Sequence, residues 1–156
     1  MAKPNDAKPL VQVACVCEKV IIEADKVATL IRIVDTYFLE IPSEPLPQGI
    51  KPVIQLTAFI ALKSGDVVGN FEVGIRLRRP EETKDGEIRK WPVEFRGEES
   101  GVHLKIDFVV QEPKLGLYWW DVLWEDELLT RIPFRLKLKE PAPMGDGVAP
   151  SETVLK

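Results

Sequence analysis

Two stretches of this chain alternate over most of their length between apolar and polar residues, and this period of two constrains the fold more than any other feature. The stretches are residues 70–79 and 101–111. Successive side chains of a β-strand point to opposite faces, so each pattern predicts a half-buried strand in an antiparallel sheet. The apolar faces consist of Phe71, Val73, Ile75 and Leu77 in the first stretch and Val102, Leu104, Ile106, Phe108 and Val110 in the second.

Three further segments alternate less regularly and are also predicted to be strands. They are residues 53–63, 91–96 and 131–138. The second contains Pro92 and the third Pro133, and proline cannot donate a hydrogen bond to the ladder. We therefore expect both strands to lie at an edge or to carry a bulge. The charged residues 80–90 predict a loop.

The first third of the chain is ambiguous between strand and helix. Residues 25–38 place Val27, Leu30, Ile31, Val34 and Phe38 on one helical face behind a possible cap. Eight residues between positions 20 and 34 are β-branched, however, and such residues lose side-chain freedom in a helix but not in a strand. We favour two strands joined by a tight turn, covering residues 10–22 and 27–34.

A length of 156 residues fits one domain with a self-sufficient core. We expect a flexible N-terminus over residues 1–9, a single domain over residues 10–139 and a disordered tail over residues 140–156, which is rich in proline and glycine. Four prolines within residues 40–52 predict a long surface crossover. Short strands at regular spacing predict an all-β fold, an antiparallel β-sandwich of seven to nine strands.

The segment GLYWWDVLWEDELL holds three of the four tryptophans and reads as a strand over residues 117–124. One face of this strand contains Asp121, and an ionised carboxylate is costly to leave in a dry core unless it is paired. The opposite face is therefore predicted to point into the core. It consists of Tyr118, Trp120, Val122 and Trp124.

The register of the hairpin with the next strand tests which face of residues 117–124 points into the core. A three-residue loop at 125–127 keeps the inward faces together, with Trp124 opposite Leu128 and Asp121 beside Arg131 on the outer face. A two-residue loop at 126–127 is rejected because it would invert one strand.

The outer face then carries an apolar patch, which is the candidate partner- or ligand-binding site. It consists of Leu117, Trp119, Leu123 and Leu129. Such a patch is covered by the chain's own N-terminal region, by a second subunit or partner protein, or by a ligand that stacks on the indole. A basic outer row follows on the last strand and is able to meet an anionic partner or to block edge-to-edge pairing. It comprises Arg131, Arg135, Lys137 and Lys139.

Gly116-Leu117-Tyr118 resembles the tyrosine corner of immunoglobulin-like sandwiches, in which the phenol bonds to the backbone upstream. CEKVIIEADKVATLIRIVD (residues 17–35) and GLYWWDVLWEDELLTRIPFRL (residues 116–136) are similar to a family of small, uncharacterised bacterial proteins with an immunoglobulin-like sandwich. The resemblance implies that fold and a cytoplasmic bacterial setting, but neither catalytic residues nor a ligand. Asp126-Glu127 departs from the Asp-Gly that such hairpins commonly have.

Motifs for common catalytic chemistries do not occur in this sequence. It has no glycine-rich nucleotide loop, no HExxH and no GxSxG, and its single histidine, His103, falls on the solvent face of a strand. Cys15 and Cys17 are too few for a zinc site or a disulfide framework. We expect no enzymatic activity, no cofactor and no bound metal.

The partners expected from composition are proteins or small ligands. A net charge of −4 disfavours nucleic acid, and no apolar run approaches the roughly 18 residues of a membrane helix. We expect a cytoplasmic, non-catalytic interaction or structural module that uses Trp119 to bind itself or another bacterial protein. The alternative is a module binding a carbohydrate-like ligand, with stacking on Trp91, Trp119 and Trp124.

Overall fold

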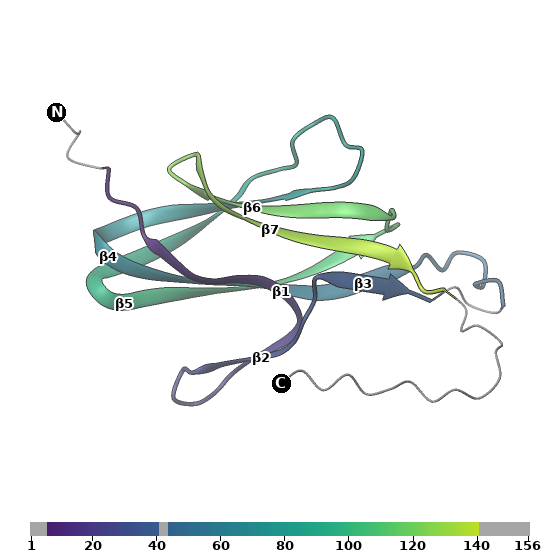
Figure 1. Cartoon of the computed structure of the whole chain (residues 1–156), viewed down its shortest axis with the longest axis horizontal. Helices are drawn as coiled ribbons and strands as arrows, with labels where there is room; N and C mark the ends of the chain where they lie inside the picture. The colour runs from purple at the N-terminus through teal and green to yellow at the C-terminus, as the bar shows by residue number, and fades with distance from the viewer. Residues whose placement is uncertain (1–5, 41–43, 141–156) are drawn as a thin grey trace, which may run out of the picture.

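A computed structural model describes residues 6–40 and 44–140, and this part of the chain contains seven β-strands (Figure 1). None of the described residues forms a helix long and apolar enough to cross a membrane. The predicted tails at residues 1–9 and 140–156 fall mostly outside the described residues. The strands are β1 (Leu10–Ile22), β2 (Ala28–Ile33), β3 (Thr36–Leu39), β4 (Val53–Arg78), β5 (Arg89–Gln111), β6 (Gly116–Trp124) and β7 (Glu127–Leu138).

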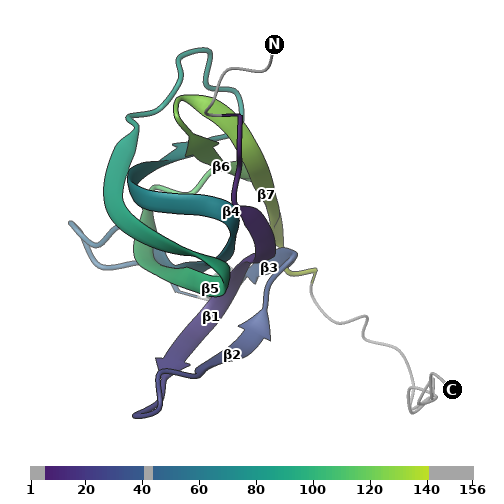
Figure 2. The same ribbon diagram turned by 90° about the vertical axis from the view of Figure 1, so that its left-hand side faces the viewer.

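The seven strands form one sheet, which curls into a half-barrel (Figure 2). Its order is β2-β1-β4-β6-β7-β3, with β5 paired to β4. All pairs are antiparallel except β3 with β7, which is parallel. The predicted all-β class is confirmed, but the sheet is mixed and differs from the predicted antiparallel arrangement at the β3–β7 pair. Between β2 and β3, the Val34 amide donates to the Val16 carbonyl of β1, and the Asp35 carbonyl accepts from the Arg135 amide of β7. These bonds lead the chain across to β7, where β3 forms the parallel pair.

β4 and β5 are longer than the sequence patterns suggested. Residues 53–63 and 70–79 belong to one strand, and residues 91–96 and 101–111 belong to its partner. The register shifts between Lys63 and Val68, where Gly65 has a φ of 55°. A bulge bends a strand without ending it, so the paired strands β4 and β5 continue around the bend and contribute to both sides of the half-barrel.

The main core lies inside the curl, as the alternation predicted. The inward aromatic residues of β6 are buried, and Trp124 packs against Phe71 and Phe95 with ring centroids 4.7 and 5.5 Å away. The Tyr118 hydroxyl donates to the Lys114 carbonyl and accepts from the Lys114 amide, both at 2.9 Å. The predicted bonding of Tyr118 to the upstream backbone is confirmed.

β1 and β2 form the tight hairpin that the β-branched residues favoured over a helix. Its turn is closed by bonds from the Glu23 amide to Val27 and from the Lys26 amide to Glu23. Past Cys17 the hairpin leaves the sheet as an arm (Figure 2), and Val20 packs with Phe59 in a second, smaller cluster on the outer face of β4.

Candidate functional site

The β6–β7 hairpin sets the geometry of the candidate site, and its turn differs from the predicted one. Glu125 and Asp126 alone form the loop, both with positive φ, and Trp124 pairs with Glu127. A bulge at Leu129 then restores the predicted register, so Asp121 faces Arg131 as expected. Two-residue hairpin loops prefer positive φ at both positions because this matches the strand twist. A two-residue loop alone would turn the apolar face of β7 outward, and the extra residue in the bulge turns it back toward the core.

The bulge exchanges the roles of two leucines. Leu128 was predicted to face Trp124 in the core, but it pairs with Leu123 on the outer side and is 46% exposed. Leu129 was predicted to lie on the outer face, but it packs against the main core. Both predictions are wrong because the sequence pattern does not reveal a single-residue bulge.

The other three predicted site residues remain on the outer face of β6. Leu117 and Trp119 are half-buried. Leu123 is only 4% exposed, because it lies against Gly74 of β4 and next to Ile88: a Cβ added to that glycine would meet atoms of both residues within 3.4 Å. The exposed part of the predicted patch is therefore reduced to Leu117 and Trp119.

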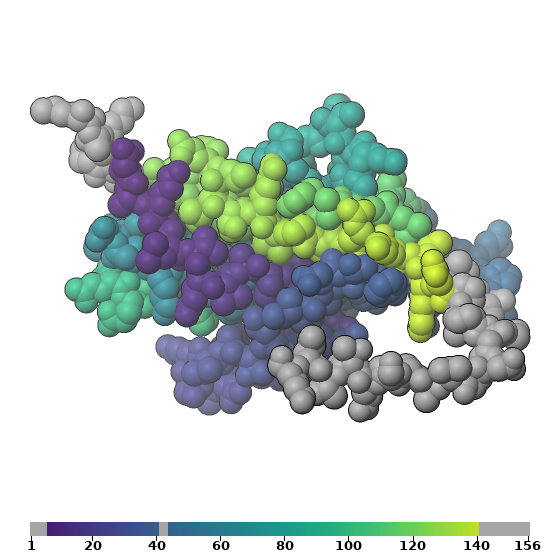
Figure 3. All heavy atoms as spheres, in the orientation of Figure 1, coloured from purple at the N-terminus to yellow at the C-terminus, as the bar shows by residue number. Residues whose placement is uncertain are grey.

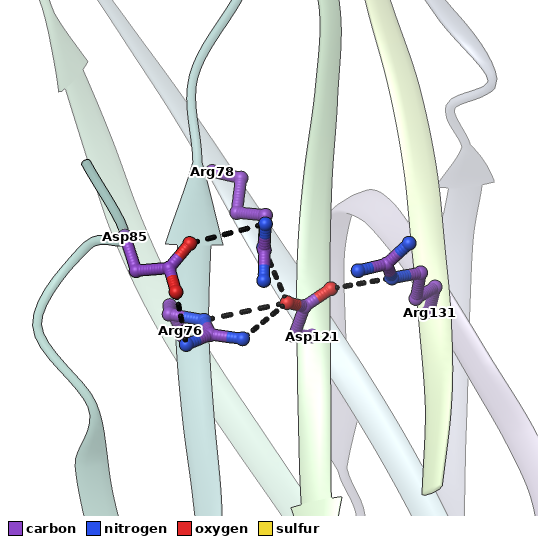
Figure 4. A network of polar contacts seen from close by, with 5 residues as sticks. All are labelled: Arg76, Arg78, Asp85, Asp121 and Arg131. Carbon is purple, nitrogen blue, oxygen red and sulfur yellow. Dashed lines mark hydrogen bonds and ion pairs between the residues drawn. The ribbon is translucent and has the colours of Figure 1, made fainter. Parts of the chain in front are cut away.

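Between them, the outer face of β6 holds a fully buried carboxylate. Asp121 has a relative exposure of 0% and receives charge-assisted hydrogen bonds from both neighbouring strands (Figure 4). From β4, Arg76 bonds to Oδ2 at 2.9 Å and Arg78 at 2.6 Å. From β7, the Arg131 Nε bonds to Oδ1 at 2.9 Å. The predicted pair with Arg131 is confirmed, but three arginines surround this carboxylate.

Sequence reasoning missed Arg76 and Arg78 as partners of Asp121. The alternation of residues 70–79 had placed both on the polar face of their strand. The missing information was the pairing of β4 with β6, which sets Arg76 opposite Asp121 and Arg78 opposite Trp119. Pairing between strands that are distant in the sequence depends on the assembled sheet.

The arginines keep Asp121 ionised. Burial alone would raise the pKa of its carboxyl group, but the hydrogen bonds from Arg76, Arg78 and Arg131 outweigh this effect and hold the pKa below its ordinary value. A buried charge is tolerated when it is paired and hydrogen-bonded in this way. The cluster therefore acts as a fixed, positively charged platform on the outside of the sheet.

Trp119 lies within this platform. It pairs with Arg78 on one side and Pro133 on the other, and the Arg131 guanidinium carbon lies 5.8 Å from the centre of its ring. A guanidinium over an indole face is held by attraction to the ring's negative face. Arg131 thus packs over the ring of Trp119, and part of the indole stays exposed.

The segment between β4 and β5, residues 79–88, projects beyond β6 at the upper edge of the molecule (Figure 3) and contacts this surface. Its Asp85 makes ion pairs to Arg76 at 3.3 Å and to Arg78 at 3.1 Å. A Cβ added to Gly116 would touch Pro80 at 3.1 Å. The N-terminal region was one of three covers considered for the patch, whereas the structure places this segment, predicted as a charged loop, against part of it.

The register extends the outer face across β7 to β3. Arg135 lies opposite Leu117, and Lys137 lies opposite Phe38, which is 54% exposed. This surface, called the basic face below, contains Phe38, Leu117, Trp119, Arg131, Arg135 and Lys137.

The other two tryptophans considered for stacking have different surroundings. Trp124 is buried in the core. Trp91 is half-buried and lines a cleft of about 340 Å³ together with Phe108 and Trp120, at the open side of the half-barrel between the two halves of β5. Glu87 and Arg89 contribute polar groups to the cleft, whereas the Asp107 carboxylate accepts a hydrogen bond from Thr57 and pairs with Lys105.

No group of three or more metal-ligating side chains occurs among residues 6–40 and 44–140. Cys15 and Cys17 are free thiols, and His103 is exposed as predicted, with its ring 5.3 Å from that of Phe59. A comparison with models of known protein families finds no match to this chain, and a comparison with curated proteins likewise finds no relative.

Proposed function

We propose that this chain is a non-catalytic interaction domain that binds a protein partner through the basic face. The observation that carries the proposal is the packing of Trp119, which is half-buried between Arg78 and Pro133 with Arg131 over its ring, so that only part of the indole is exposed. Tryptophan and arginine are the residue types that contribute most to binding at protein interfaces, and both lose less entropy on binding when they are already fixed.

A wider setting belongs to the same proposal. The two hydrogen bonds between Tyr118 and Lys114 support an immunoglobulin-like origin of the half-barrel, as in the bacterial family that the sequence resembles. A cytoplasmic location remains part of the proposal, as does the absence of catalytic activity.

The test is the substitution Trp119→Glu in the full chain. Partners are first identified by cross-linking and mass spectrometry in the source cells, and the purified partner is then titrated against each variant. We expect Trp119→Glu to weaken binding by at least about 30-fold, the effect of losing a central interface residue. Circular dichroism and the melting temperature check that the fold is kept.

The matched control is Val109→Glu, which places the same residue at an exposed apolar position on β5. It should leave partner affinity within about twofold, as expected of a surface change outside the interface. Equal affinity of the Trp119→Glu variant and the unchanged chain would contradict the proposal.

A second candidate function is supported by the cleft at Trp91. Trp91 and Phe108 offer aromatic surfaces beside the charged residues Glu87 and Arg89, and this combination suits a carbohydrate-like ligand. Sugar binding there should change tryptophan fluorescence in the unchanged chain but not in a Trp91→Ala variant. An unchanged spectrum over a panel of mono- and oligosaccharides counts against this candidate.

A further inference from the structure

We infer that the partner of the basic face presents an acidic, extended segment, and that Asp85 occupies in the free protein a position that a partner carboxylate takes in the complex. This inference rests on the proposed function and names the chemistry of the partner.

The first argument is the charge of the surface. The chain as a whole has a net charge of −4. Around Asp121 and along β7, however, the outer face gathers five basic side chains, and the carboxylates paired with them are those of Asp85 and the buried Asp121. The basic residues are Arg76, Arg78, Arg131, Arg135 and Lys137. A surface that opposes the overall charge attracts an anionic partner.

The second argument is Asp85 itself. Its side chain is 61% exposed and comes from a loop outside the sheet, yet its two oxygens pair with Arg76 and Arg78 (Figure 4). The arginines therefore accept a carboxylate from the solvent side while they also hold Asp121 from the sheet side. An exposed ion pair of this kind contributes little stability, so another carboxylate can replace it at small cost.

The third argument is the number of donors that remain. The Nε of Arg131 donates a hydrogen bond to Asp121, and within the described residues the two Nη groups of Arg131 have no hydrogen-bond partner. Arg135 and Lys137 likewise make no side-chain ion pair within the ranges 6–40 and 44–140. Along β7, alternate residues are about 7 Å apart, which matches the spacing of alternate side chains in an extended peptide.

The apolar members of the basic face complete the recognition surface. Leu117 and Trp119 lie beside the basic row on β6, and Phe38 lies beside it on β3. An extended segment that alternates acidic and apolar side chains would therefore contact both kinds of group.

The charge also argues against two other occupants. A second copy docked by two-fold symmetry would set this basic face against itself, and like charges at an interface are unfavourable. A nucleic acid offers phosphates to the same arginines, but the net charge of −4 repels it at longer range. Both remain outcomes of the test.

The experiment uses the ¹⁵N-labelled full chain and three probes: an eight-residue peptide of alternating glutamate and leucine, its glutamine counterpart, and oligothymidylate. The indole N–H signal of Trp119, assigned with a Trp119→Phe variant, reports on binding. We expect the acidic peptide to shift this signal and the glutamine peptide to leave it unchanged. The apparent affinity should fall as salt is raised.

Variants then locate the binding. Arg135→Glu combined with Lys137→Glu should abolish the shift, while Arg96→Glu, an exposed reversal on β5, should not. Asp85→Asn should tighten binding of the acidic peptide about threefold, because it removes the competing carboxylate.

Three results would overturn the inference: no shift with the acidic peptide, equal shifts with both peptides, or tighter binding of oligothymidylate than of peptide. A concentration-dependent dimer in sedimentation velocity that is lost in Trp119→Glu would identify a second copy as the occupant instead. None of these results would remove a protein contact at Trp119, which the partner titration tests separately.

Discussion

The outer face of β4 is covered along both halves, but by opposite means. Over the first half, Phe59 and Ala61 are buried under the β1–β2 arm, whose Val20 packs on them in a small apolar cluster. Over the second half, Arg76 and Arg78 cover the strand and hold Asp121 with their guanidinium groups. One half is closed by hydrophobic contact and the other by an ionic network.

The difference shows where binding chemistry remains accessible. In the apolar half, burial raises the pKa of the Cys17 thiol to about 11, with a smaller contribution from Cys15, so the thiolate is scarce and unreactive at neutral pH. In the ionic half, hydrogen-bond donors and an indole face remain at the surface. The second half therefore offers recognition groups, and the first contributes stability.

The largest expected effect tests the apolar half. Phe59→Ala removes a ring that is 3% exposed, and it should lower the free energy of unfolding by about 4 kcal/mol, measured by urea denaturation. The control is Ile33→Ala on β2, an exposed residue whose loss should cost less than about 0.5 kcal/mol. Similar losses in both variants would mean that the arm does not seal this face.

The next effect tests the ionic half. Asp121→Asn leaves three arginines around a neutral group, and it should lower the free energy of unfolding by about 3 kcal/mol at pH 7. Glu94→Gln, which weakens an exposed pair with Arg96, should cost less than about 1 kcal/mol. A small loss in Asp121→Asn would show that the network stabilises the fold little.

The smallest expected effect is the pH dependence of the difference in unfolding free energy between the unchanged chain and Asp121→Asn. The folded-state pKa of Asp121 is lowered, so its stabilising contribution is present above the ordinary aspartate pKa of about 3.9 and is lost as pH falls through the folded value. The gap in stability between the unchanged chain and Asp121→Asn should therefore narrow below about pH 4, measured by denaturation at several pH values. A gap that stays constant to pH 2 would mean that folding does not lower the pKa of Asp121.

Much of the fold followed from local patterns. Period-two alternation located the strands, β-branching decided between helix and strand in the first third, and the polarity of Asp121 set the inward face of β6. These features can be read from short segments because successive residues of a strand point alternately to the buried and the exposed face of the sheet. The one-residue bulge at Leu129 escaped prediction because it leaves the alternation on either side intact.

The candidate site was predictable only in part. Trp119 and the Asp121–Arg131 pair come from one hairpin, whose register the sequence constrains. Arg76, Arg78 and Asp85 join them from elsewhere in the chain, and Phe38 joins through the parallel pairing of β3 with β7.

By itself, the sequence determined that the chain forms β-strands, which face of most strands points inward, and that Trp119 and Asp121 share the outer side of one strand. Only the tertiary structure decided that the strands form a single curled, mixed sheet and that three arginines enclose one carboxylate. The physical reason is that alternation records the burial of each side chain, whereas strand order depends on which surfaces fit together once the chain has collapsed.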